Sequence, residues 1–133
     1  MLKMKNITRL FLYLNLCLTL LACSKISPKG EIEVKDVTVE NFTKLNLKGD
    51  FKVFFAKGNQ NLVSVETYPN VYKNLDIEVE NGILTIEENR KTDQVDFYNI
   101  TIFGKNDLSD VSLSDKVEMN VSGQVKTPEF SLH

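Results

Sequence analysis

The sequence predicts an all-β domain built from short strands, and three observations support this prediction. From Glu31 onward, apolar and polar residues alternate with period 2 along most of the chain, as they do in strands with one buried face. Branched side chains occupy most of the apolar positions, and they favour strands. Asn81-Gly82 lies between two such runs and predicts a hairpin, because both central residues of a type I′ turn adopt positive φ.

The runs are expected to form strands in the following order. The first run, residues 32–39, changes phase between Val34 and Val37, which predicts a β-bulge. Gly49-Asp50 predicts a turn after the second run, and the polar residues 57–61 predict a loop after the third. The later runs are marked by alternating apolar residues: Leu45 and Leu47; Phe51, Val53 and Phe55; Val63 and Val65; Leu75, Ile77 and Val79; Leu84 and Ile86; Ile100 and Ile102; Val111 and Leu113; Val117, Met119 and Val121; Phe130 and Leu132.

Two segments interrupt the alternation. Pro69 suits the first turn of a helix, and Val71 and Leu75 have the i, i+4 spacing of one helix face. One helical turn is therefore expected near residues 69–75. Residues 88–93 carry several charges and predict a loop on the solvated surface.

A short repeat occurs in the last third of the chain. Val111-Ser112-Leu113 recurs as Phe130-Ser131-Leu132, nineteen residues later. Such spacing is typical of the rungs of a β-solenoid. A solenoid usually needs three or more repeats, so two unrelated short strands explain the pattern equally well.

The N-terminus has the features of a secretory signal. Lys3, Lys5 and Arg9 precede an apolar run over residues 10–21, and no acidic residue lies among them. As a helix this run spans about 18 Å, whereas the hydrocarbon core of a bilayer is about 30 Å thick. Residues 1–22 are therefore expected to form a signal peptide that is removed.

The end of this signal resembles the lipobox of bacterial lipoproteins. It is Leu20-Leu21-Ala22-Cys23, with a less usual residue at Leu21. The resemblance implies cleavage before Cys23 and acylation of that cysteine, and two or three acyl chains hold a protein stably on a membrane. A plain secretory signal with a chance cysteine is the alternative. Cys17 leaves with the signal in either case, so no free thiol and no disulfide are expected in an acylated mature chain.

Three regions follow from these assignments. Residues 1–22 are the signal peptide, residues 23–30 are the lipidated cysteine and a tether, and residues 31–133 are the β domain. The tether is small, polar and contains Pro28 and Gly30, as a linker does. Its reach is at most about 25 Å, so the domain is expected close to the membrane surface.

Composition excludes several classes of function. The formal net charge is −2, and the basic residues of the signal account for part of the positive charge, so the mature chain lacks the basic face of a nucleic-acid binder. The single histidine is the terminal His133, which leaves no plausible general base of that type and few ligands for zinc. No catalytic residue, metal site or cofactor site is predicted.

Three groups of residues suggest a binding or catalytic site, and each also has a simpler structural explanation. Clustered aspartates suggest calcium, or turn residues that accept hydrogen bonds: Asp107, Asp110 and Asp115. Four aromatic residues suggest a sugar-binding platform, although core positions are the more common explanation: Tyr68, Tyr72, Phe97 and Tyr98. Paired carboxylates suggest glycoside hydrolysis, although a solvated strand face explains them more simply: Glu31, Glu33, Glu78, Glu80 and Glu87.

Most of the mature chain also resembles a known family. Residues 39–58, 63–67 and 74–86 are similar to the putative auto-transporter adhesin head (GIN) domain, and the resemblance extends over about residues 37–132. The family is common in lipoproteins and secreted proteins of Bacteroidetes. The resemblance implies a right-handed, β-solenoid-like stack of short strands with hairpins, and it transfers no catalytic residue.

The chain departs from the family pattern at its C-terminus. Family members usually continue with further Ser-Gly-rich rungs, whereas this chain ends at His133. An open solenoid end exposes unpaired backbone groups and apolar side chains. Either another copy of the chain caps this end, or the chain is a short or truncated member of the family. Some self-association through that end is expected.

Together these features predict a cell-envelope lipoprotein anchored through Cys23. Its expected role is a non-enzymatic structural or adhesin-like module that binds a glycan or an envelope protein. The outer membrane is favoured, with the leaflet undecided, because Ser24-Lys25 does not resemble an inner-membrane retention signal. Two alternatives remain open: a glycan-processing enzyme that uses two carboxylates, and a periplasmic partner in envelope assembly or stress.

Overall fold

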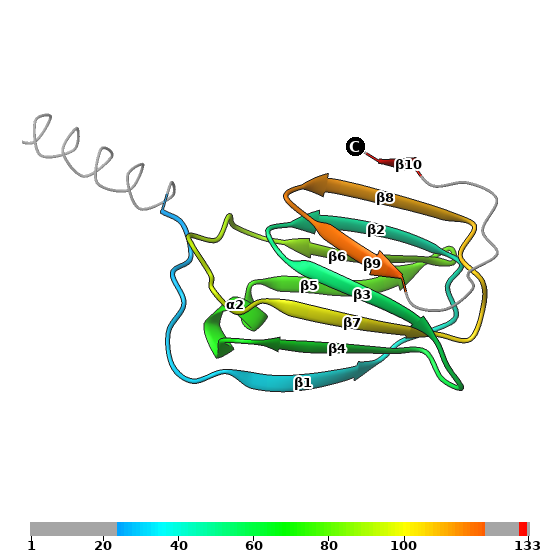
Figure 1. Cartoon of the computed structure of the whole chain (residues 1–133), viewed down its shortest axis with the longest axis horizontal. Coiled ribbons are helices and arrows are strands. Elements are labelled where there is room, and N and C mark those ends of the chain that lie inside the picture. Colours follow the sequence, from blue (N-terminus) through cyan, green and yellow to red (C-terminus); the bar gives the residue numbers. More distant parts are fainter. Residues whose placement is uncertain (1–23, 122–130, 133) are drawn as a thin grey trace, which may run out of the picture.

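The computed structural model describes residues 24–121 and 131–132, which form strands and one short helix (Figure 1). The predicted signal peptide, Cys17, Cys23, Phe130 and His133 lie outside the described residues. No helix in the described part of the chain is long and apolar enough to cross a membrane. The elements are β1 (Glu33–Thr38), β2 (Lys44–Gly49), β3 (Lys52–Lys57), β4 (Leu62–Thr67), α2 (Pro69–Lys73), β5 (Leu75–Glu80), β6 (Ile83–Glu88), β7 (Asn99–Gly104), β8 (Asp110–Asp115), β9 (Glu118–Val121) and β10 (Ser131–Leu132).

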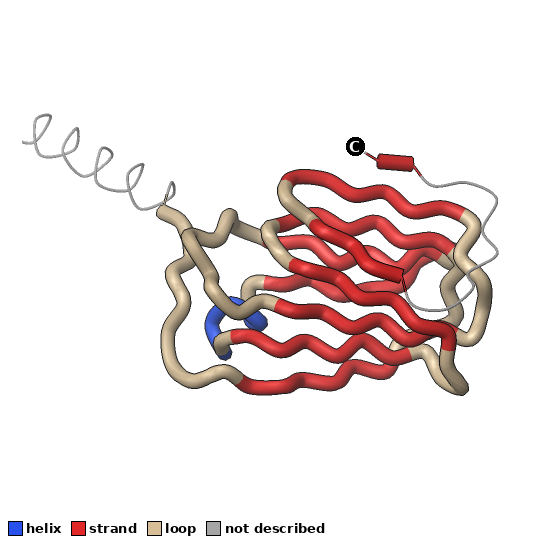
Figure 2. Tube along the Cα trace, in the orientation of Figure 1, coloured by secondary structure: helices blue, strands red, loops and turns tan. Residues whose placement is uncertain are grey.

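The strands form two mixed sheets, which confirms the prediction of an all-β fold (Figure 2). One sheet, called here the β3 sheet, has the order β1-β4-β7-β3-β9. The other, called here the β2 sheet, has the order β10-β8-β2-β6-β5. Parallel and antiparallel pairs occur in both.

Three times the chain passes from a strand of the β2 sheet directly to a strand of the β3 sheet, and each passage gives a pair of consecutive strands. They are β2–β3, β6–β7 and β8–β9, and they stack on one another in parallel register in both sheets. The first pair along the chain lies between the other two, whereas the rungs of a simple solenoid stack in chain order. Antiparallel strands β4, β1 and β5 complete the two sheets beside β6–β7.

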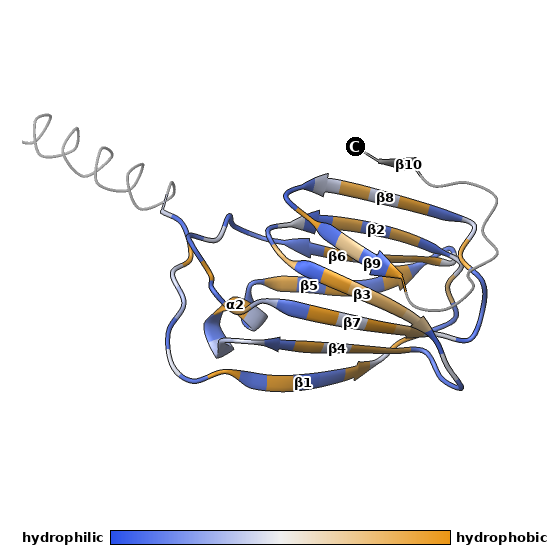
Figure 3. Ribbon diagram, viewed as in Figure 1, coloured by the Kyte–Doolittle hydropathy of each residue, from blue (hydrophilic) through white to orange (hydrophobic). Residues whose placement is uncertain are grey.

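The core lies between the two sheets, and period-2 alternation explains how it forms (Figure 3). On β2, Leu45 and Leu47 are buried, while the lysines and the asparagine next to them are exposed. On β3, Val53 and Phe55 are buried in the same way. Each central strand thus buries one row of apolar side chains, which is the main stabilising contribution expected for such a sheet pair.

The bulge expected in the first strand is absent. β1 pairs with β4 in continuous antiparallel register from Glu33↔Thr67 to Thr38↔Leu62. Val34 points outward and is 57% exposed, so its phase does not have to match that of Val37. β1 is an edge strand, so the core does not require its apolar residues to keep one phase, and the change of phase needs no bulge.

The local turn predictions are confirmed. Asn81 and Gly82 have φ values of 54° and 75° and join β5 to β6 as an antiparallel hairpin. The helical turn is α2, with Pro69 in its first turn and Val71 buried.

The C-terminal repeat corresponds to a parallel strand pair. Ser131 lies opposite Ser112, and Leu132 lies opposite Leu113. Ser131 and Leu132 of the second copy therefore lie beside the first copy in one sheet.

Candidate functional site

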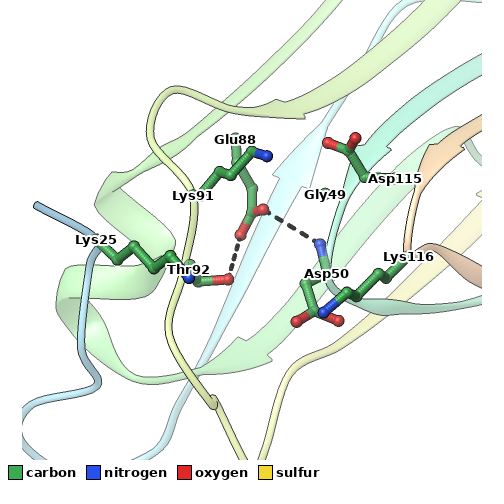
Figure 4. A pocket seen from close by; sticks show the side chains of 8 residues that line it. All are labelled: Lys25, Gly49, Asp50, Glu88, Lys91, Thr92, Asp115 and Lys116. Carbon is green, nitrogen blue, oxygen red and sulfur yellow. Dashed lines mark hydrogen bonds between the residues drawn. The ribbon is translucent and has the colours of Figure 1, made fainter. Parts of the chain in front are cut away.

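A polar pocket of about 280 Å³ opens at one end of the two sheets (Figure 4). It lies where the turn from β2 to β3, the end of β6 and the turn after β8 come together. Glu88 lies at its centre, with one loop hydroxyl and several charged side chains around it. The lining residues are Lys25, Gly49, Asp50, Glu88, Lys91, Thr92, Asp115 and Lys116.

The Glu88 carboxylate accepts three hydrogen bonds from three segments of the chain. Thr92 Oγ1 and Tyr98 OH donate to Glu88 Oε2 over 2.8 and 3.0 Å. The backbone N–H of Asp50 donates to Glu88 Oε1 over 3.2 Å. Because both carboxylate oxygens are engaged, Glu88 joins the end of β6 to the β2–β3 turn and to the segment that leads into β7.

The protonation of this cluster follows from its burial. Burial raises the pKa of Glu88, and the hydrogen bonds from Thr92 and Tyr98 oppose that rise. Burial also raises the pKa of Tyr98 far above its usual range, and the nearby charge of Glu88 adds to the rise. Tyr98 therefore keeps its proton and acts as a hydrogen-bond donor, while its ring packs 5.4 Å from that of Phe51.

A glycine allows the β2–β3 turn to approach Glu88. A Cβ added to Gly49 would lie 2.8 Å from Glu88 Cγ and would overlap the ring of Phe51. Side chains at such a distance clash, so a larger residue would push the turn away and lengthen the hydrogen bond from Asp50.

The arrangement fits a structural clamp better than an acid catalyst. A glycosidase of the expected kind places two carboxyl groups on either side of the scissile bond, and one of them transfers its proton to the leaving group. In Figure 4 the side chain of Asp50 points away from the Glu88 carboxylate. Three protein donors already occupy the Glu88 carboxylate, two at Oε2 and one at Oε1.

The structure separates the three aspartates considered for calcium. Asp107 forms an ion pair with Lys57 at 2.9 Å. Asp110 and Asp115 lie at opposite ends of β8. Within the described residues, no group of three His, Cys, Asp or Glu side chains is placed to hold a metal ion. The calcium explanation is therefore unsupported, and the turn and surface explanation agrees with these positions.

Three of the four aromatic residues suggested for sugar binding belong to the core or pack against it, and the fourth, Phe97, is partly buried beside Tyr98 in the segment that leads into β7. Tyr98 is 4% exposed and belongs to the core. Tyr68 and Tyr72 pack against the core, and Tyr68 OH donates a 2.7 Å hydrogen bond to Asp96, which raises the pKa of Tyr68. The core explanation is confirmed for these tyrosines.

The carboxylates that alternate along the strands lie on solvated faces, as expected. Glu78 and Glu80 are exposed on the edge strand β5. Glu33 is exposed beside Lys35 at 3.6 Å. The prediction for residues 88–93 was wrong at Glu88, because β6 continues to that residue and turns its carboxylate inward.

The residues expected to form a free tether are bound to the domain. Ile26 donates its N–H to the Lys91 carbonyl and accepts from the Asp93 N–H, both over 2.9 Å. The Asn70 side chain holds Lys29 N–H at 2.9 Å and the Ser27 carbonyl at 2.6 Å. The guanidinium of Arg90 donates to Ser24. Residues 24–29 therefore lie along α2 and the loop after β6.

Similar folds occur in solved structures of bacterial proteins. A putative lipid binding protein from Parabacteroides distasonis ATCC 8503 has a TM-score of 0.67 at 18% identity, over 74% of this chain and 44% of that one. A putative adhesin from the same strain has a TM-score of 0.64 at 19% identity, over 74% of this chain and 42% of that one. A putative adhesin from Bacteroides fragilis NCTC 9343 has a TM-score of 0.60 at 16% identity, over 80% and 57% of the two chains.

These likenesses establish the fold alone. The chain spans about half the length of the solved proteins that it matches. Comparison of the sequence with curated proteins gives no significant match.

The sequence itself matches a family model over residues 41–133, which is more than half of the chain. The matched family is the one that the sequence resembles. Neither the family nor the similar solved proteins are described as enzymes. The chain belongs to the family described as putative auto-transporter adhesin, head GIN domain.

Proposed function

We propose that this protein is a lipid-anchored lipoprotein of the bacterial cell envelope that acts as a non-enzymatic, adhesin-like binding module. The lipobox at Cys23 supports the anchor, and the adhesin description of the family supports a role in binding at the envelope or cell surface. The outer membrane is the membrane we favour. Glu88, held by three protein donors, supports a role without catalysis.

The observation that carries the proposal is the binding of residues 24–29 to the domain. Ser24 follows Cys23 directly and interacts with Arg90. Acyl chains on Cys23 would therefore hold α2 and the loop of residues 89–98 next to the lipid, with no free linker between them. The module would be presented in one orientation.

The opposite end of the molecule then faces away from the membrane. In Figure 1 the blue segment at the start of the described chain lies at one end of the long axis, and the loop between β3 and β4 lies at the other. A partner outside the membrane would reach that end first.

The stacked strand pairs also suggest how the module extends. We propose that β6–β7, β2–β3 and β8–β9 are rungs of a right-handed, solenoid-like stack and that β10 begins a further row beside β8. Within the described residues, β9 hydrogen-bonds only with β3, so its other edge supports the expected self-association at this end.

The test combines mass spectrometry with membrane fractionation. Cys23→Ala should leave an unprocessed or soluble chain, whereas the wild-type protein should carry acyl chains on Cys23 and sediment with the outer membrane. Cys17→Ala is the matched control and should behave as wild type. A wild-type chain with an intact Met1, or with an unmodified Cys23 thiol, would contradict the anchor.

The binding role needs a separate measurement. Cells that lack the protein should adhere less to host matrix or to neighbouring cells than wild-type cells, and expression of the wild-type protein should restore adhesion. Equal adhesion in both strains, with normal acylation of Cys23, would contradict the adhesin-like role and leave the anchor intact.

A further inference from the structure

A patch of apolar and amide side chains covers part of the outer face of the β3 sheet. Phe54 is 43% exposed, although most large apolar residues in the central strands are buried. It lies between the buried Val53 and Phe55, so three consecutive apolar residues break the alternation at this point. We define the Phe54 patch as Phe54, Ala56, Asn59, Gln60, Leu62 and Phe103.

Strand register brings these side chains onto one surface. Leu62 lies opposite Phe103, and Phe103 lies opposite Ala56, so the three form one row across β4, β7 and β3. Phe54 is in the adjacent row of the same face, opposite Thr101. Phe54 and Phe103 are thus diagonal neighbours, a separation that aromatic side chains can span.

The loop between β3 and β4 forms a wall beside this surface. It encloses a shallow pocket of about 330 Å³, lined by Gly58, Asn59, Gln60, Leu62 and Phe103. Such a volume lies at the lower end of the range for small-ligand sites.

Hydrogen bonds hold this loop in place at both ends. Gly58 donates its N–H to β7 over 3.0 Å. Asn61 is 7% exposed, and its side chain accepts from Lys105 N–H over 3.0 Å and donates to the segment before β2 over 2.6 Å. The amides of Asn59 and Gln60 are therefore carried on a fixed backbone, which lowers the entropy lost on binding.

The two rows that contain the patch carry no charge between β4 and β9. The row of Phe54 continues through Ser64, Thr101 and Asn120, which offer hydroxyl and amide groups. Charge begins in the next row of the same face, where Lys52 of β3 lies opposite Glu118 of β9. The outer face of the β2 sheet carries charge as well, because acids of β5 lie across the sheet from Lys44 and Lys48 of β2. An uncharged surface of this size stands out in a chain with 26% charged residues.

We propose that the Phe54 patch binds a neutral glycan, and this inference rests on the binding role proposed above. The C–H groups of a sugar ring are attracted to the electron-rich face of an aromatic ring, and sugar hydroxyls pair with amides and hydroxyls. A charged glycan would find no counter-ion among the two rows. A protein partner would find little of the charge complementarity that orients such complexes.

The position of the patch agrees with that ligand. The β3–β4 loop lies at the end of the long axis opposite the blue segment that starts the described chain (Figure 1). A domain anchored through Cys23 would therefore present the patch away from its own membrane, where external polysaccharide is accessible.

The test uses the full-length protein, purified in a detergent without a sugar headgroup. A glycan array should show binding to neutral hexose or N-acetylhexosamine oligosaccharides, and not only to sialylated or sulfated ones. Calorimetric titration with the best neutral oligosaccharide should show that Phe54→Ala weakens binding about tenfold or more, the loss expected for one aromatic contact. Gln60→Ala should weaken binding as well.

Val34→Ala is the matched control. Val34 is 57% exposed on the outer face of the same sheet but lies at the far edge on β1, so its loss should leave binding unchanged. Circular dichroism should give the same spectrum for all variants, because Phe54 and Val34 are both exposed.

Several outcomes would overturn the inference. They are the absence of neutral glycan binding, binding of charged glycans alone, equal affinity of wild type and Phe54→Ala, or a dimer that Phe54→Ala dissociates. Any of these results, obtained with a protein that is acylated at Cys23 and supports normal cell adhesion, would refute the glycan site and leave the anchor and the binding role in place. Glycan binding by a protein whose Cys23 is unmodified would refute the proposed anchor and leave the glycan site in place.

Discussion

Tyr98→Phe tests the Glu88 clamp with the deletion of a single hydroxyl. The ring of Tyr98 would still pack against Phe51, so no cavity larger than one oxygen atom should form. The lost hydrogen bond joins a residue that is 4% exposed to a carboxylate, and such bonds contribute about 1.5–3 kcal/mol when buried and charged. Glu88 is only half-buried, so we expect a loss of about 1.5 kcal/mol in the free energy of unfolding.

The pH dependence of this loss has a definite sign. The hydrogen bond from Tyr98 lowers the pKa of Glu88, so it stabilises the ionised carboxylate. Its contribution is present above the pKa of Glu88 and is lost as the pH falls through that value. The cost of Tyr98→Phe should therefore be larger at neutral pH than at about pH 4, near the unperturbed pKa of glutamate.

Urea denaturation followed by circular dichroism at both pH values measures these differences. Tyr72→Phe is the control, because Tyr72 is partly buried and its hydroxyl makes no hydrogen bond within residues 24–121. Equal costs for the two variants at neutral pH would refute the clamp. A cost for Tyr98→Phe that does not change with pH would refute the role of ionised Glu88.

Further predictions concern Glu88, the β2–β3 turn, the bound N-terminal segment and the β9 edge. Burial raises the pKa of Glu88 in the folded protein, so the stability that Glu88 contributes is greatest below its unfolded pKa and falls as the pH rises through its folded pKa. Glu88→Gln should remove this pH dependence from the free energy of unfolding measured in urea titrations. A variant with the same pH profile as wild type would contradict the raised pKa. Gly49→Ala should lower the free energy of unfolding by about 1–3 kcal/mol, the usual cost of overpacking, and a neutral result in the same titration would contradict the close approach of the turn. Asn70→Ala removes two hydrogen bonds to residues 27–29, so limited proteolysis should cut that segment faster than in wild type while the domain stays intact; equal rates would show that Asn70 does not hold it. Val121 faces inward yet is 38% exposed, so Val121→Lys should weaken self-association in sedimentation experiments; a wild-type monomer at high concentration would refute association at this end.

Local patterns were enough to predict many of the elements. The Asn81-Gly82 hairpin and the turn of helix at Pro69 depend on residues close together in sequence, so their geometry can be inferred without the fold. The repeat at residues 111–113 and 130–132 is compatible with solenoid rungs or with two unrelated short strands, and the structure pairs Ser112 with Ser131 in parallel. The sequence did not predict that β2–β3 lies between β6–β7 and β8–β9. Alternation within a strand shows which face is buried, but it does not specify which strands lie on either side.

The sites were harder to predict because their members are far apart in sequence. Glu88 reads as the start of a charged loop, and one of its donors, the Asp50 N–H, comes from 38 residues earlier. The patch at Phe54 combines β3, β7 and the β3–β4 loop, and only the extra apolar residue between Val53 and Phe55 hinted at it.

Taken alone, the sequence determined the class of fold and the local turns, and it predicts the anchor at Cys23, because each depends on composition or on neighbours along the chain. Tertiary structure decided which carboxylate is turned inward, which aromatic rings are exposed and where residues 24–29 bind. Those outcomes depend on contacts between distant segments. A side chain's exposure and hydrogen-bond partners are properties of the assembled sheets, and no local pattern contains them.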